Sequence, residues 1–193
     1  DLGKLDSNPV KTLVDACEAA FGTVDVLVNN AGTTWGQPAE EHSYTGWQKV
    51  MTLNVDVCFL VAQEVARRFM IPRKSGKIIN IASIAGFKGN RANSGIFTSA
   101  YNTSKAAAIN LTRALAGEWG RYNINVNAIC PGYFPTKLAQ GLDGVSEMIK
   151  EGTPLGRIGG DEDIKGAAVF FATEMSRHVT GQAMAVDGGN SVV

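Results

Sequence analysis

The sequence has no excess of charge of either sign. Its 193 residues include 18 Lys and Arg and 18 Asp and Glu, so the formal net charge is zero. Nucleic acids and anionic membranes select basic surfaces, and this balance gives no electrostatic reason to expect either partner. The apolar runs are also shorter than the roughly 20 residues that a membrane-spanning helix needs.

Cysteine and histidine are scarce. Cys17, Cys58 and Cys130 are odd in number and form no Cys-x-x-Cys pair, which predicts a reducing, cytoplasmic location. Cys58 and Cys130 lie in apolar runs, which predicts that both are buried free thiols. The two histidines, His42 and His178, have no Gly-x-Ser-x-Gly nucleophile motif to accompany them. No cluster of metal-ligating residues occurs, so we predict no metal site.

What the chain does have is a 45% hydrophobic fraction, enough for one domain over residues 1–193. Apolar periodicity alternates between helical and strand-like segments, which implies βαβ crossovers and a parallel sheet covered on both faces. We expect a loop at 83–99, irregular or partly helical structure at 137–151, and Asp161 as a helix cap. The expected strands are 24–28, 77–82, 124–129 and 182–186, and the expected helices are 9–21, 44–70, 101–120 and 161–172.

A phenol and an ammonium lie four residues apart where the helix 101–120 is expected to begin. Tyr101 and Lys105 fall on one face of that helix. A nearby cation stabilises the phenolate and lowers the pKa of tyrosine, so the phenol can act as a general acid or base near neutral pH. Taken alone, the pair also fits an ordinary surface contact.

Polar segments follow three of the expected strands. Ligands of open parallel sheets bind beyond the carboxyl ends of the strands, where Ser83, the turn 29–32 and the loop 131–136 should meet. The Ser83 hydroxyl is then able to hydrogen-bond a carbonyl oxygen that Tyr101 protonates. Each of these segments, by itself, also fits a plain strand end or turn.

Asn54 lies inside the expected helix 44–70, flanked by Leu53 and Val55. Asparagine is mildly unfavourable in a helix interior, so its presence there calls for a reason. The side chain is either a satisfied core amide or a water-binding residue of a proton relay.

Together these segments resemble the short-chain dehydrogenase/reductase family. The matching motifs, in the family's order, are NNAG (29–32), the asparagine of LNV (54), NIAS (80–83), YNTSK (101–105), INVNAICPG (124–132) and VDGG (186–189). The resemblance implies an α/β, Rossmann-like, doubly wound parallel sheet and NAD- or NADP-dependent hydride transfer. The reaction would interconvert a small-molecule ketone and a secondary alcohol. The stretch 101–138 is most similar to the gluconate 5-dehydrogenase and 3-oxoacyl-carrier-protein reductase branch, which implies a sugar acid or a 3-oxoacyl substrate.

The resemblance also implies roles for individual residues. Tyr101 would be the acid/base, Lys105 its pKa-lowering partner and a ribose ligand, and Ser83 the substrate-orienting hydroxyl. Asn54 would hold a water in a relay with Lys105. The adenosine side of the cofactor would lie near Asp1, Leu2, Asn29, Ala31 and Gly32, and the nicotinamide near Ile129, Pro131, Gly132 and Thr136. Family members are usually tetramers, so we expect a homotetramer built on the helices 44–70 and 101–120.

The family's first strands and its glycine-rich turn are missing from this sequence. The chain begins at Asp1 rather than at Met, and a βαβ unit takes roughly 30 residues, so we expect roughly 60 or more residues to precede it. Strand 24–28 would then have a bare apolar edge, and a pyrophosphate would lack its helix N-terminus. We therefore expect this chain alone to bind NAD(P) poorly and to be inactive. The choice between NAD and NADP is not readable, because the residues that make it lie in the missing part.

The spacing between Ser83 and Tyr101 is a few residues longer than the one commonest in the family. The extra residues lie in 87–98, which we expect to form part of the substrate mouth. Two alternatives to an active oxidoreductase remain: a scaffold or fragment that keeps the fold without binding cofactor, and a hydrolase using Ser83. The hydrolase lacks the surrounding nucleophile motif.

Overall fold

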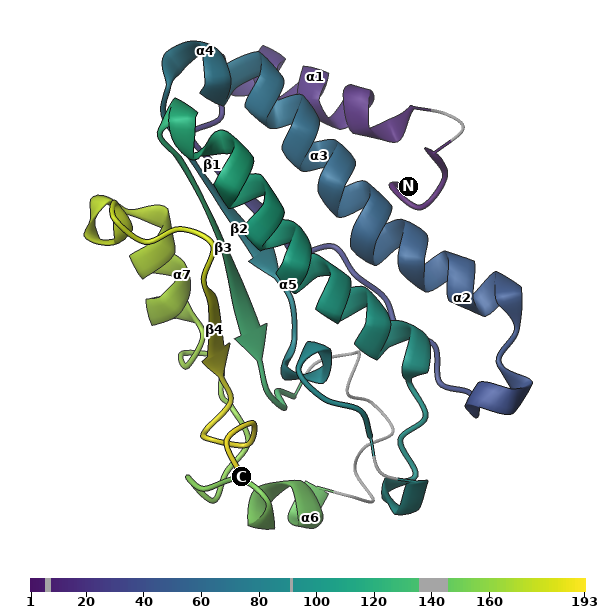
Figure 1. Cartoon of the computed structure of the whole chain (residues 1–193). Helices are drawn as coiled ribbons and strands as arrows, with labels where there is room; N and C mark the ends of the chain where they lie inside the picture. The colour runs from purple at the N-terminus through teal and green to yellow at the C-terminus, as the bar shows by residue number, and fades with distance from the viewer. Residues whose placement is uncertain (6–7, 91, 136–145) are drawn as a thin grey trace.

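The computed structural model describes residues 1–5, 8–90, 92–135 and 146–193 (Figure 1). Its centre is a sheet in the order β1-β2-β3-β4, in which every neighbouring pair is parallel. Asn29 lies opposite Asn80, and Ile81 lies opposite Ile129. The predicted parallel α/β sheet is confirmed. The strands are β1 (Val26–Asn29), β2 (Gly76–Ile81), β3 (Ile124–Pro131) and β4 (Ala183–Val186).

Helices cover both faces of this sheet. Alternate residues of a strand point to opposite faces, and Ile78 packs with α1, α3 and α5 whereas Ile79 packs with Phe171 of α7. The doubly wound arrangement expected from the sequence is therefore present. In the described part of the chain, no helix is long and apolar enough to cross a membrane. The helices are α1 (Pro9–Phe21), α2 (Tyr44–Met51), α3 (Val57–Val65), α4 (Ile71–Arg73), α5 (Ser99–Trp119), α6 (Ser146–Glu151) and α7 (Lys165–Ala172).

The helices α2, α3 and α4 form one continuous rod, joined by two wide π-type turns at Thr52–Asp56 and Ala66–Met70 (Figure 1). The prediction that this helix ends before Pro72 is wrong by one turn. Pro72 comes just after the second wide turn, where the helical hydrogen bonds are already displaced from their α-helical pattern. The backbone N–H that proline lacks therefore removes little from the hydrogen bonding of the helix. The rod ends at Lys74, which adopts a left-handed conformation with φ of 50°.

The other boundary correction concerns α7. This helix begins at Lys165, and its N-cap residue, Ile164, makes no side-chain cap, so the prediction of Asp161 as the cap is wrong. Asp163 instead uses its carboxylate to accept the Gly160 N–H at 2.7 Å and to bind Arg157. These bonds stabilise a turn before the helix, which delays its start.

The expected loop 83–99 contains short helical turns, and the stretch 137–151 was expected to be irregular or partly helical. The stretch 83–99 includes two 3₁₀ turns, Ile84–Gly86 and Ala92–Ser94. Of the stretch 137–151, the part that the structure describes is the helix α6.

Strand β1 is an edge strand in the described part of the chain, since it pairs with β2 alone. Val26 and Val28 are 36% and 47% exposed, a high value for valines in a parallel sheet. The apolar edge expected from the sequence is therefore visible.

Candidate active site

A close contact between a turn and a helix brings the catalytic candidates together. Strand β2 ends at Ile81, and Ser83 leads into the turn Ile84–Gly86, which lies against α5. A Cβ on Gly86 would lie 2.7 Å from the Lys105 carbonyl carbon, so only glycine allows this approach. The turn therefore holds Ser83 beside the first turns of α5, which carry Tyr101 and Lys105.

The Ser83 hydroxyl is oriented by its own turn. Its Oγ accepts the Ala85 N–H at 3.1 Å, and the side chain is 9% exposed. A hydroxyl has one donor and two acceptor positions, so this bond leaves the O–H free to donate. Ser83 is therefore able to donate to an oxygen placed at the carboxyl end of β2.

Tyr101 is held as a protonated phenol. Burial raises its pKa above the ordinary 10.0, and interaction with the Ser83 side chain opposes that rise without cancelling it. The predicted net lowering of the Tyr101 pKa is therefore wrong for this structure, in which burial dominates. The Lys105 ammonium lies 5.6 Å from the centre of the Tyr101 ring, and its hydrogen bond goes elsewhere, to the Ile81 carbonyl.

Lys105 is a buried cation fixed to the end of β2. Its side chain is 6% exposed, and its Nζ donates to the Ile81 carbonyl oxygen at 2.7 Å. Desolvation lowers the pKa of this ammonium from its ordinary 10.5, because burial disfavours the charged form. An ammonium has three donors, so Lys105 retains donors for a ligand beside Tyr101.

Asn54 lies in the wide turn Thr52–Asp56 and is 3% exposed. Its Oδ1 accepts the Thr33 N–H at 2.8 Å, and its Nδ2 donates to the Thr33 carbonyl and to Ser104 Oγ, both at 2.9 Å. The structure thus contains the satisfied core amide, one of the two alternatives for this residue. The relay role stays a prediction.

Gly32 lies where the Asn54 amide and the Lys105 ammonium approach each other. A Cβ built on Gly32 would be 3.3 Å from Asn54 Oδ1 and 3.6 Å from Lys105 Nζ. A side chain at this position would crowd the Asn54 amide, so glycine allows the turn 29–32 to lie close to Asn54 and Lys105.

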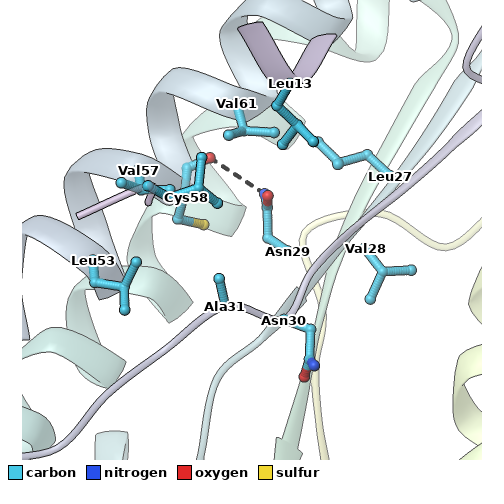
Figure 2. Close-up of a pocket in the computed structure, with 11 residues that line it drawn as sticks. Leu13, Leu27, Val28, Asn29, Asn30, Ala31, Leu53, Val57, Cys58 and Val61 are labelled. Carbon is cyan, nitrogen blue, oxygen red and sulfur yellow. Dashed lines mark hydrogen bonds between the residues drawn. The ribbon is translucent and has the colours of Figure 1, made fainter. Parts of the chain in front are cut away.

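A buried amide network beneath the site was missed by the sequence reasoning. Asn29 Nδ2 donates to Asn80 Oδ1 at 2.9 Å and to the Cys58 carbonyl at 3.2 Å, and Asn80 Nδ2 donates to Thr112 Oγ1 at 2.9 Å. Figure 2 shows the Asn29 amide directed at the Cys58 carbonyl of α3. The network ties β1, β2, α3 and α5 together. The signal that could have revealed it is Asn80, a polar residue between two isoleucines in an apolar strand.

An apolar recess of about 100 Å³ lies between β1 and α3, beside this network (Figure 2). Three of the predicted cofactor residues, Leu2, Asn29 and Ala31, are among those that line it. Its size and apolar walls fit one flat ring rather than a whole dinucleotide. The recess is lined by Leu2, Leu13, Leu27, Val28, Asn29, Asn30, Ala31, Leu53, Val57, Cys58 and Val61.

The remaining candidates lie at the ends of the chain and after β3. The Asp1 carboxylate accepts the N–H of Gly3 in its own turn at 3.0 Å. Pro131 ends β3, and Gly132 donates its N–H to the Val186 carbonyl at 3.0 Å, which places both at the rim beside β4. Thr136 lies outside the described residues. Among the residues that are described, no group of three or more His, Cys, Asp or Glu side chains is placed to hold a metal ion.

Sequence and structure comparisons agree with this geometry. A family model described as enoyl-(acyl carrier protein) reductase matches residues 5–191. The chain is 46% identical to a 2-dehydro-3-deoxy-D-gluconate 5-dehydrogenase from Dickeya dadantii, over 92% of this chain and 69% of that protein. It is 38% identical to a 3-oxoacyl-[acyl-carrier-protein] reductase from Chlamydia muridarum, over 98% and 73%.

The chain belongs to the short-chain dehydrogenase/reductase family. A gluconate 5-dehydrogenase from Burkholderia cenocepacia, solved in complex with NADP and tartrate, superposes with a TM-score of 0.89 and 37% identity. That match covers 95% of this chain and 71% of the other. Membership makes the chain an NAD(P)-dependent oxidoreductase of CH–OH groups with a Rossmann-like fold. The family, fold, enzyme class and cofactor predicted from the sequence are thereby confirmed.

Proposed function

We propose that this short-chain dehydrogenase/reductase interconverts a ketone and a secondary alcohol on a sugar acid, with Tyr101 as the proton donor and acceptor. The observation that carries the proposal is the grouping of Ser83, Tyr101 and Lys105 at the carboxyl end of β2. The sugar-acid substrate is favoured by the 46% identity to a 2-dehydro-3-deoxy-D-gluconate 5-dehydrogenase. A 3-oxoacyl thioester is the second candidate, on the strength of the 38% identity to a 3-oxoacyl carrier-protein reductase.

The cofactor would lie along Ala31, Gly32, Tyr101 and Lys105 at the rim, with Pro131 on its far side. The Lys105 ammonium uses one donor for the Ile81 carbonyl and keeps the others for the cofactor. When bound, the nicotinamide supplies or takes the hydride at its C4 position. The protein then has to hold the substrate carbonyl and manage one proton.

Ser83 and Tyr101 divide these two roles in the proposal. The Ser83 O–H donates to the carbonyl oxygen, because the bond that Ser83 Oγ accepts from the Ala85 N–H leaves this donor free. The Tyr101 Oη transfers its proton to the same oxygen as negative charge develops there. Because burial keeps Tyr101 protonated, the resting site is ready for reduction of a ketone.

Lys105 and Asn54 support the tyrosine. In the proposal Lys105 stabilises the phenolate left after proton transfer, at its 5.6 Å separation from the ring centre. Asn54 and Lys105 meet beside Gly32, which supports a route by which a proton returns to Tyr101. Homotetramer formation and a cytoplasmic location remain part of the proposal.

The test uses the full-length gene product that carries this chain. Oxidation of NADPH or NADH is followed with 5-keto-D-gluconate and, separately, with a 3-oxoacyl thioester. Tyr101→Phe should lower kcat by roughly 10²- to 10⁴-fold, the usual contribution of a general acid. Tyr44→Phe, the same substitution at a tyrosine that is 73% exposed on α2, is the matched control and should leave kcat unchanged.

Each outcome distinguishes a candidate function. Activity on the thioester alone would select the second substrate class. A wild-type protein that binds cofactor and reduces neither ketone would favour the scaffold alternative. A Tyr101→Phe variant with full activity would overturn the assignment of the proton donor.

A further inference from the structure

Lys88 follows Ser83 by five residues and is hydrogen-bonded to the first turn of α5. The turn Ile84–Gly86 leads from Ser83 to Lys88, and the Lys88 carbonyl accepts the Asn102 Nδ2–H at 2.8 Å. Asn102 is the neighbour of Tyr101 at the start of α5. The backbone of Lys88 is thus linked to the start of α5, next to Tyr101 in the chain.

The Lys88 side chain reaches across to the C-terminal segment. Its Nζ donates to Asn190 Oδ1 at 3.1 Å and to the Asn190 carbonyl at 3.2 Å. Asn190 is 8% exposed, and its Nδ2 donates to the Gly152 carbonyl at 3.1 Å and to Thr153 Oγ1 at 3.4 Å. A buried, fully engaged amide therefore holds the Lys88 ammonium in one place.

The charge of Lys88 is not neutralised there. Both of its hydrogen-bond partners are neutral oxygens, and within the described ranges no carboxylate oxygen comes within 4.0 Å of its ammonium. The Asp187 carboxylate, whose pKa Lys88 helps to lower, is engaged by the N–H groups of Gly189 and Ser191 at 3.0 and 2.7 Å. An ammonium has three donors, so one remains for an anionic ligand.

We propose that Lys88 is a specificity-determining residue that binds the carboxylate of an acidic substrate, with Asn190 as its positioning residue. The inference rests on the proposed function and adds the residue that recognises the acid group. It also gives the segment 87–98 a role, because the insertion between Ser83 and Tyr101 carries the cation. A charge-assisted hydrogen bond to a carboxylate is lost when the ammonium is removed, whereas an uncharged substrate loses nothing there.

The experiment compares two ketones that differ only in the acid group. 5-Keto-D-gluconate carries a carboxylate where L-sorbose carries a hydroxymethyl group. In the full-length gene product, Lys88→Met should lower kcat/KM for 5-keto-D-gluconate by roughly 10- to 100-fold through KM, and change the value for L-sorbose less than about threefold. If L-sorbose turns over too slowly, its inhibition constant against 5-keto-D-gluconate replaces kcat/KM.

Four further variants sharpen the test. Lys88→Arg keeps the charge and should retain most of the preference for the acid. Asn190→Ala should weaken that preference, and adding it to Lys88→Met should produce little further loss, because both act through one ammonium. Lys11→Met, on α1 and 61% exposed, is the control and should behave as wild type.

If Lys88→Met lowered kcat/KM equally for both ketones, Lys88 would be only a structural link between the segment 87–98 and the C-terminus, and the inference would be overturned. An unchanged KM of this variant for 5-keto-D-gluconate would overturn it as well. Wild-type activity on both ketones in that same experiment would leave the proposed function standing. A wild type that reduces neither ketone would instead overturn the proposed function and the inference together.

Discussion

Replacing Thr112 with valine tests whether the buried amide network holds α5 against the sheet. Valine matches the shape of threonine and removes only the hydroxyl. In the structure that hydroxyl accepts from Asn80 Nδ2 at 2.9 Å and donates to the Ala108 carbonyl at 2.8 Å. Thr112 is fully buried and Asn80 is 1% exposed, so water has no access to replace the lost partner.

The expected cost follows from the donor that is left without an acceptor. Asn80 Oδ1 remains bound to Asn29 Nδ2 and close to Cys58 Sγ, so the Asn80 amide is held and cannot turn toward another acceptor. An unsatisfied buried donor costs about 1–3 kcal/mol. For a domain of this size each kcal/mol lowers Tm by roughly 2–4 °C, so Thr112→Val should lower Tm by roughly 2–12 °C.

The assay is thermal and urea unfolding of the wild type and variant, with Thr103→Val as control. Thr103 lies on the same helix with an exposed side chain, so this control reports the intrinsic cost of valine in a helix. A Thr112→Val variant within about 0.5 kcal/mol of the control would refute the reasoning, because it would show that the Asn80 amide finds another partner or needs none.

Two further predictions concern the contact of the Ser83 turn with α5 and the buried thiols. Gly86→Ala should destabilise the fold by about 1–3 kcal/mol and lower kcat/KM, because its Cβ would meet the Lys105 backbone at 2.7 Å. Gly89→Ala is the control, since a Cβ there has open space around it. In the same unfolding and kinetic assays, its free energy of unfolding should stay within about 0.5 kcal/mol of the wild type. Burial raises the pKa of Cys58 and of Cys130 from 9.0 to about 11, so at pH 8 each should be alkylated about 100-fold more slowly in the native than in the urea-unfolded protein. The contribution of the two protonated thiols to the free energy of unfolding is full below about pH 9 and is lost as the pH rises toward about 11. Labelling is read by mass spectrometry, and equal rates for the native and the unfolded protein would contradict the raised pKa.

The sequence predicted the order of elements and the location of the site because both depend on local signals. Apolar periodicity marks each strand and helix, and a polar residue at a strand end marks the rim of a parallel sheet. Ser83 and Tyr101 were therefore placed correctly with no knowledge of their distance. Helix ends were less predictable: α7 starts four residues after Asp161, because Asp163 forms a turn with Arg157 and Gly160 that no periodicity reveals.

The electrostatics of the site could not be predicted from spacing. A separation of four residues on a helix suggests a cation beside the phenol, yet Lys105 points its hydrogen bond at the Ile81 carbonyl. The pKa of Tyr101 then depends on burial, which only the packed structure gives. The same holds for Asn54, whose three bonds to Thr33 and Ser104 join segments that are 21 and 50 residues away in the chain.

The catalytic candidates are held by hydrogen bonds to the backbone. Lys105 binds the Ile81 carbonyl, Asn54 binds both backbone groups of Thr33, and Ser83 binds the Ala85 N–H. Substitutions elsewhere in the chain leave such partners in place, because every residue supplies the same backbone groups. The positions of these side chains should therefore be insensitive to substitutions elsewhere in the chain. In the proposed function, selection among substrates then falls to side chains such as Lys88.

The Lys88–Asn190 contact is the one to which we assign substrate choice. It links the segment 87–98 to the C-terminal segment. Both segments lie outside the βαβ framework, so they can change without disturbing β2 or α5. If substrate choice resides in this pair, exchanging Lys88 should redirect the enzyme between acidic and neutral ketones while the rate of proton transfer from Tyr101 stays the same. A change in KM without a change in kcat is the result expected if Lys88 contributes to substrate binding and Tyr101 to the chemical step.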